Sequence, residues 1–132
     1  MKELSDDQKK QMRELFEENN LTKDDVFTHK HYVIITRSGI EKIQATRNIR
    51  VQYDVEKLDR DFVVIRAKAT MKDDDGVKTQ VETFGEAGPE NCRNAYYVAT
   101  AEKRALSRAV LKLVGLYKHR VFGEDENVDS DE

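Results

Sequence analysis

The sequence predicts an α+β domain with an N-terminal helix, a largely antiparallel three- to four-stranded sheet with a short inserted helix, and a long C-terminal helix packed on the sheet. Two observations support this. Segments rich in β-branched residues follow one another between residues 31 and 84 instead of alternating with long helices. A helical pattern then runs from Asn91 to Tyr117 with no Gly or Pro before Gly115.

The first predicted element is a helix from Ser5 to Asn20. Ser5 is a suitable N-cap, and Met12, Leu15 and Phe16 form a narrow apolar stripe. A short turn from Thr22 to Val26 follows, with acidic residues in its first turn.

The next three elements bring the chain into the sheet. His31 to Thr36 is predicted to be a strand. Ser38-Gly-Ile-Glu41 has the form of a capping box, which predicts a short helix ending near Ala45. Residues Ile49 to Val55 alternate apolar and polar side chains, which is typical of a half-buried strand.

A β-hairpin and a linker complete the predicted sheet. The strands are Phe62 to Met71 and Val77 to Phe84, and the Asp-Gly signal within Asp73 to Gly76 marks the turn between them. Gly85 to Pro89 is predicted to be a linker, because proline cannot continue the ladder.

The long helix is predicted to have two different faces. Small and aliphatic residues, Val98 among them, recur at three- and four-residue steps from Ala95 to Leu113 and predict the buried face. Arg104, Arg108 and Lys112 follow each other at i, i+4 spacing on another face. Like charges so placed repel by a few tenths of a kcal/mol per pair, so this row is either solvated or covered by an anion.

Charge is unevenly distributed along the 132 residues. The net charge is −3, but Gly123 to Glu132 contains six acids and no Lys or Arg, which leaves 23 basic and 20 acidic side chains in residues 1–122. We therefore expect one domain over 1–122 and a disordered acidic tail over 123–132. The single Cys92 excludes an internal disulfide. The lack of a long apolar run and of a signal-peptide h-region leads us to expect a cytoplasmic protein that does not enter membranes.

The arginine and lysine residues of the long helix are the main functional candidates, with a second basic group around the first strand, the short helix and the second strand. Lys and Arg provide most of the sequence-independent affinity for nucleic acid, and exposed tyrosines stack on unpaired bases. The predicted nucleic-acid-binding residues are Lys103, Arg104, Arg108, Lys112, Arg47, Arg50, Arg37 and Tyr96. The alternative is that this face is merely solvated.

Two other function classes stay open. Asp59, Asp61 and Glu82 could form the magnesium site of a nuclease, although no ligand spacing supports it. The acidic tail could instead recruit a protein partner through residues Glu124 to Glu132. No motif for a catalytic centre, a metal site or a cofactor is found, so we expect a non-enzymatic protein without cofactors.

The segment AYYVATAEKRALSRAVLKLVGLY, preceded by VETFGEAGPENCRN and followed by VFGEDE, resembles phage-type single-strand annealing proteins, the Erf/Sak-like relatives of the Rad-fifty-two superfamily. The residues that match this family's helix pattern are Ala101, Lys103, Arg104, Ala105, Arg108, Ala109 and Gly115. The resemblance implies a hairpin sheet packed on the long helix, assembly into rings or filaments, and single-stranded DNA held by its backbone in a basic groove. It also implies a role in strand annealing during phage homologous recombination.

Overall fold

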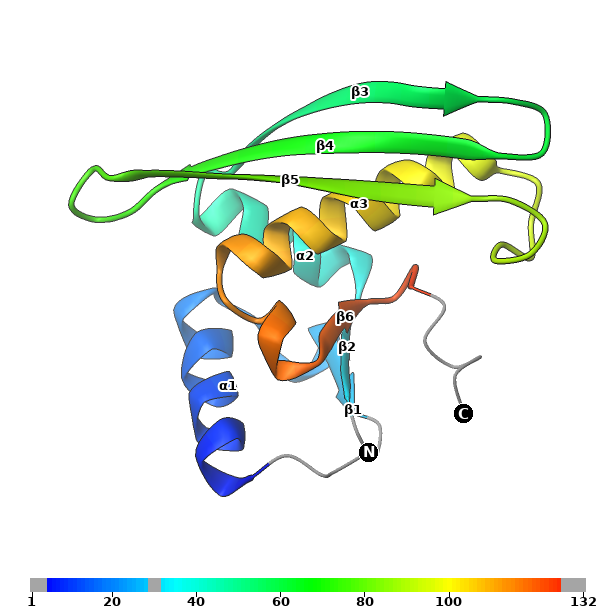
Figure 1. Ribbon diagram of the computed structural model, residues 1–132. Helices are drawn as coiled ribbons and strands as arrows, with labels where there is room; N and C mark the ends of the chain where they lie inside the picture. The colour runs from blue at the N-terminus through cyan, green and yellow to red at the C-terminus, as the bar shows by residue number, and fades with distance from the viewer. Residues whose placement is uncertain (1–4, 29–31, 127–132) are drawn as a thin grey trace.

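A computed structural model describes residues 5–28 and 32–126 and confirms the α+β fold class (Figure 1). The elements in chain order are helix α1 (Asp6–Glu18), 3-10 turn η1 (Lys23–Asp25), strands β1 (Val26–Thr28) and β2 (Val33–Ile35), helix α2 (Arg37–Thr46), strands β3 (Arg50–Leu58), β4 (Val63–Lys72) and β5 (Lys78–Ala87), helix α3 (Tyr97–Leu113), 3-10 turn η2 (Tyr117–His119) and strand β6 (Val121–Gly123).

The main sheet is antiparallel in the order β3-β4-β5, and α3 runs beneath it (Figure 1). Its inner face carries the small and aliphatic residues of β4, including the buried Ile65, Ala67 and Ala69. The helix comes so close to β5 that a Cβ added to Gly85 would lie 2.0 Å from the carbonyl oxygen of Ala101. Only glycine permits this contact between helix and strand backbones.

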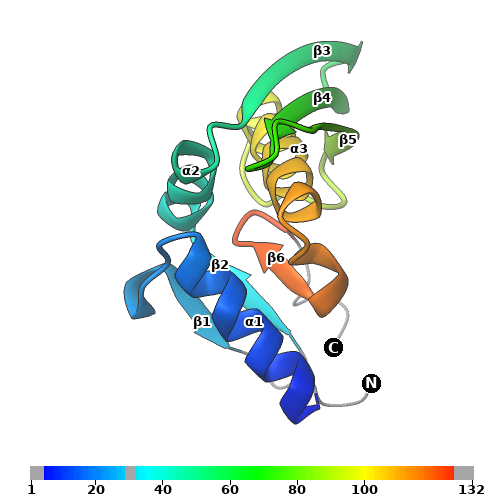
Figure 2. The same ribbon diagram turned by 90° about the vertical axis from the view of Figure 1, so that its left-hand side faces the viewer.

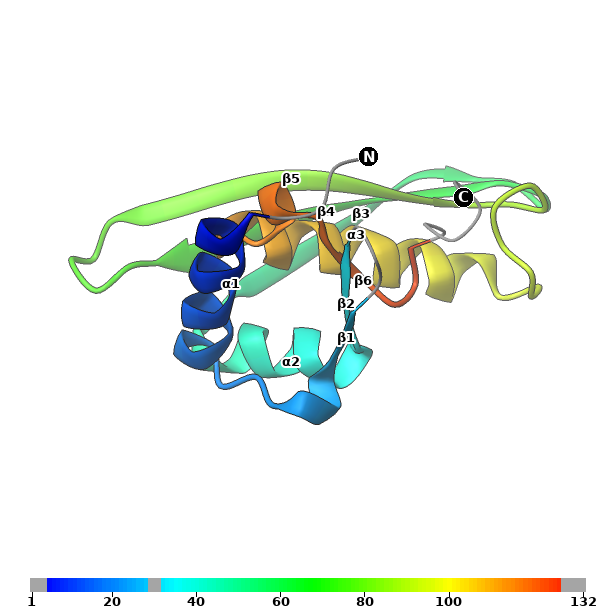
Figure 3. The same ribbon diagram turned by 90° about the horizontal axis from the view of Figure 1, so that it is seen from below.

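A second sheet, in the order β1-β2-β6, lies on the other side of α3 (Figure 3). Strands β2 and β6 pair in parallel, with Val33 opposite Val121 and Ile35 opposite Gly123. A Cβ on Gly123 would lie 2.7 Å from the Cβ of Ser107, so β6 packs directly on α3. The helix is therefore covered on two sides, which accounts for the burial of Ser107 at 2% exposure.

Several predicted boundaries are wrong, for local reasons. Strand β5 continues to Ala87 because β4 begins at Val63, which pairs with Ala87, so the first residues of the predicted linker belong to the sheet. Helix α3 spans Tyr97–Leu113, shorter at both ends than predicted. Helix α2 is capped by Thr36, whose hydroxyl accepts from the Gly39 amide, and not by Ser38.

The predicted tail begins within the fold. Val121–Gly123 is strand β6, and the Glu124 amide donates to the Ile35 carbonyl at 3.0 Å. Residues 124–126 thus contact the domain, in contrast to the prediction of a disordered tail from residue 123. Residues 127–132 lie outside the described residues, as does His31 of the predicted first strand.

Candidate nucleic-acid interface

The predicted solvent-facing row on α3 is wrong for Arg104, which is only 5% exposed. Its guanidinium donates to three backbone carbonyls, those of Asp125 (Nε, 2.7 Å), Glu86 (Nη1, 2.8 Å) and Asn91 (Nη2, 2.5 Å). These acceptors belong to the C-terminal segment, the edge of β5 and the loop before α3. Arg104 therefore joins three segments of the fold, and its burial keeps the guanidinium from a phosphate in solution.

Arg108 is similarly occupied. Its Nε and Nη2 donate to the two carboxylate oxygens of Glu126 at 2.7 and 2.8 Å, and Nη2 also reaches Glu86 at 3.1 Å. Hydrogen bonding to Glu126 raises the pKa of Arg108 further above its already high ordinary value, in spite of the opposing effect of burial. Two carboxylates of the chain itself thus neutralise Arg108, so at this position the row is covered by an anion and not merely solvated.

The other predicted residues outside the main sheet do not form one surface. Arg37 pairs with Glu41 and Glu102, each at 3.7 Å. Lys112 is exposed, with its Nζ 5.4 Å from the centre of the Tyr117 ring.

Lys103 and Tyr96 are the last two of these residues. Lys103 lies near Asp125 together with Arg37 and Arg104, and all three cations oppose the rise in the pKa of this carboxyl that burial causes. Lys103 is half-buried on α3. Tyr96 is 75% exposed at the N-terminal end of α3, in a hollow lined by apolar residues together with Asp59, Arg60 and Glu102. The predicted helix-based groove is therefore not assembled.

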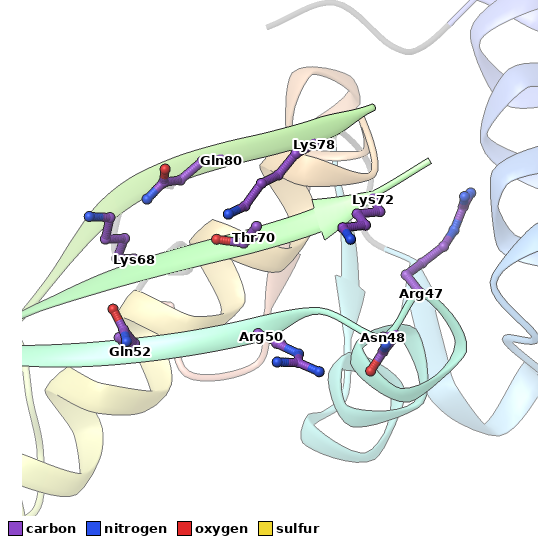
Figure 4. A pocket seen from close by; sticks show the side chains of 9 residues that line it. All are labelled: Arg47, Asn48, Arg50, Gln52, Lys68, Thr70, Lys72, Lys78 and Gln80. Carbon is purple, nitrogen blue, oxygen red and sulfur yellow. The ribbon is translucent and has the colours of Figure 1, made fainter. Parts of the chain in front are cut away.

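A different basic surface lies on the outer face of the main sheet, opposite α3 (Figure 4). It is a hollow with a volume of about 610 Å³, here named the basic hollow. Its lining residues are Arg47, Asn48, Arg50, Gln52, Lys68, Thr70, Lys72, Lys78 and Gln80. Arg47 and Arg50 belong to the predicted set, and Lys68, Lys72 and Lys78 do not.

The strand ladder explains why these side chains meet. Arg50 is opposite Thr70, which is opposite Gln80, and Lys72 is opposite Lys78 in the next row that faces the same side. Residues i and i+2 of a strand share a face. The buried apolar residues of β4, such as Ala67 and Ala69, therefore point to α3, while Lys68 and Lys72 point outward. Figure 4 shows these side chains rising from three adjacent strands and from the turn after α2.

The basic hollow contains five cationic side chains and no carboxylate among its lining residues. Within the described part of the chain, no acidic oxygen lies within 4.0 Å of the side-chain nitrogens of Arg50, Lys68, Lys72 or Lys78. Arg47 is partly engaged, because its Nε donates to Asn19 at 2.8 Å and Nη2 lies 3.5 Å from Glu18. Four uncompensated cations close together attract a polyanion.

The other half of the same sheet face has the opposite character. Arg66 lies within 3.6 Å of three carboxylates, those of Asp54, Glu56 and Glu82. Glu82 is also the ladder partner of Lys68, but Arg66 engages its carboxylate. The outer face is therefore basic at the β4–β5 hairpin end and internally neutralised beyond Lys68.

The lysines of the basic hollow were missed although the sequence holds their signal. Lys68, Thr70 and Lys72 alternate with Ala69 and Met71, which places them on one strand face. The ladder adds Lys78 and Gln80 from β5, and this juxtaposition depends on the hairpin register.

The residues proposed for a nuclease site are not gathered. Among the residues that the structure describes, no group of three or more His, Cys, Asp or Glu side chains is placed to hold a metal ion. Asp59 lies 3.5 Å from Lys57, and Glu82 pairs with Arg66.

Within the same described ranges, none of the helices has the length and apolar character needed to cross a bilayer. Comparison of the chain with protein-family models, curated proteins and solved structures found no match.

Proposed function

We propose that this protein binds single-stranded DNA through its backbone in the basic hollow and promotes strand annealing without a catalytic step. The observation that carries the proposal is the group of four cations, Arg50, Lys68, Lys72 and Lys78, that lack carboxylate partners among the described residues on an open sheet face. Phosphates are the ligands that such a group neutralises, with release of counterions from the strand.

The lining of the basic hollow favours contact with the backbone over contact with bases. No aromatic side chain lines it, so it offers no platform for base stacking. Thr70, Asn48, Gln52 and Gln80 supply neutral donors that suit phosphate and sugar oxygens. A strand held by its phosphates keeps its base edges free for a complementary strand, as annealing requires. The resemblance of α3 and its flanks to phage-type annealing proteins agrees with this function.

The test is a titration of fluorescently labelled single-stranded oligonucleotide at several salt concentrations. Four phosphate contacts predict a slope of about −2.8 for the logarithm of the binding constant against the logarithm of salt concentration. The double variant Lys72→Ala/Lys78→Ala should reduce the slope by about 1.4 and weaken binding at low salt. The matched control is Lys9→Ala/Lys10→Ala, which removes the same charge from exposed positions of α1.

Equal loss of binding in both double variants would show that only net charge matters and would refute the basic hollow as the site. Annealing is measured separately, from the rate at which two complementary labelled strands become a duplex. A protein that binds single strands but does not raise this rate would retain the binding part of the proposal alone. The same incubation with magnesium tests the nuclease alternative, because shortened oligonucleotides would show cleavage.

A further inference from the structure

Strand β3 presents an unpaired edge together with an uncovered apolar face. Within the described residues it pairs only with β4, and α3 packs on β4 and β5 instead of on β3 (Figure 2). Its inward-facing side chains are consequently exposed, Tyr53 by 41%, Val55 by 58% and Leu58 by 66%. Long edge strands with exposed apolar residues are ready templates for another strand.

Exposed apolar side chains continue beyond the strand, in a hollow that Asp59, Arg60 and Glu102 also line. Leu58 also lines a hollow of about 500 Å³ with the first turn of α3, where Tyr96 and Val98 are 75% and 50% exposed. Val98 was predicted to lie in the core, so its exposure is a second sign that this part of the fold is incomplete in a single chain. Contiguous patches of this kind on a small domain mark interaction surfaces.

We propose that the β3 edge binds the β3 edge of a second copy of this chain, antiparallel about a two-fold axis at Tyr53. The sequence of the strand is complementary to itself in this register. Each Arg50 faces Glu56 of the second copy, each Val51 faces Val55, each Gln52 faces Asp54, and the two Tyr53 residues face each other. Opposite charges meet on the outer face and apolar side chains meet on the inner face.

The β-bulge in β3 supports this register. The regular ladder runs from Arg50 to Val55, and the register with β4 shifts between Val55 and Lys57. Pairing centred on Tyr53 uses the regular stretch from Val51 to Val55, and the Arg50–Glu56 pair at each end involves the bulged residue Glu56. Centring on Asp54 would instead place two like carboxylates opposite each other and would set Arg50 against Leu58, without an opposite charge. Oε1 of Glu56 lies 3.1 Å from Nε of Arg66, so Arg50 of the second copy would share this carboxylate with Arg66.

The pairing would join two main sheets into one sheet of six strands. Both basic hollows would then lie on the same outer face. The two Arg50 residues would be offset by six residues along the paired strands, or about 20 Å at the rise of a β-strand. The inference goes beyond the proposed function and does not depend on it, but it would give the dimer a place for each of two nucleic-acid strands.

The first experiment measures the dimer dissociation constant by sedimentation equilibrium. Val55→Lys puts a charge on the apolar side of the joint and should weaken dimerisation about tenfold or more. The control is Val77→Lys, because Val77 is also 58% exposed but lies at the β4–β5 turn. Circular dichroism checks that both variants fold. A wild-type protein that stays monomeric at about 100 μM, a concentration at which dimers of micromolar affinity would form, overturns the proposal, as does equal weakening by both variants.

A second experiment tests the register. In a Cys92→Ser background, Tyr53→Cys should give disulfide-linked or bis-maleimide-linked dimers, because the axis places position 53 opposite itself. Val51→Cys and Val55→Cys should link efficiently only when the two variants are mixed. Glu56→Lys should weaken dimerisation about tenfold through two like-charge contacts, and Arg50→Glu/Glu56→Lys should restore it. Linking in the single Val51→Cys variant without the mixture, or no rescue by the double variant, would refute this pairing.

Discussion

Replacing Arg104 with alanine should destabilise the fold without directly removing a DNA contact. The side chain is 5% exposed, and each of its three donating nitrogens bonds a carbonyl from a different segment, those of Asp125, Glu86 and Asn91. Alanine leaves these acceptors without their partner and opens a cavity between α3, β5 and the C-terminal segment.

The expected loss follows from the hydrogen bonds. Hydrogen bonds to a charged group contribute about 1.5–3 kcal/mol each, and water can reach some of the freed carbonyls at the sheet edge. We therefore expect a loss of about 3–5 kcal/mol in the free energy of unfolding, or about 10–20 °C in Tm for a domain of this size. Arg104→Lys keeps the positive charge but places its donors on a single nitrogen, which does not reproduce the three-way contact of the guanidinium, and should lose about 2 kcal/mol.

Urea denaturation followed by circular dichroism measures this loss. The control is Lys112→Ala, an exposed position on the same helix, which should change stability by about 0.5 kcal/mol or less. DNA affinity is then measured well below the melting temperature of Arg104→Ala and should match that of the wild type. A variant within about 1 kcal/mol of the wild type that has lost DNA binding would refute the structural role and restore Arg104 as a nucleic-acid contact.

Three further predictions address packing and pH. Gly85→Ala should lower the free energy of unfolding by several kcal/mol, because the new Cβ meets the backbone of Ala101 and of the neighbouring turn of α3, where no flexible group can move away. Chemical denaturation measures this loss, and a variant as stable as the wild type would show that the helix can shift. Hydrogen bonding to Lys42 holds the pKa of Asp25 below its ordinary value of 3.8, so its contribution is present above that pH and lost as pH falls; Asp25→Asn should lower stability at pH 7 and flatten the acid limb of a Tm–pH profile, and an unchanged limb would contradict this role. Burial lowers the pKa of His119 below 6.5, so the unfolded chain binds its proton more readily and stability should fall as pH drops through 6.5; His119→Gln should reduce the fall, and identical Tm–pH profiles would exclude a contribution from this group.

The sequence was informative where the determining interactions are local. Alternation and the Asp-Gly signal identified the β4–β5 hairpin, since a strand face and a short turn are properties of neighbouring residues. The role of Arg104 could not be inferred in the same way, because its acceptors lie 13 to 21 residues away along the chain. Helical periodicity orders side chains around an axis, but it does not show that a second sheet covers the side of α3 that carries Ser107.

The basic residues of α3 and of the main sheet differ in whether the chain supplies their counterions. Arg108 lies beside the edge of β5 and is neutralised by Glu86 and by Glu126 from the C-terminal segment, so the chain itself supplies the anion that the row of basic residues needs. Lys72 and Lys78 stand on an open sheet face, and no described carboxylate lies within pairing distance of either. Like charges repel within both groups. The group without an internal counterion gains most from an external one, and this difference is the reason for proposing the sheet, and not α3, as the face that binds a polyanion.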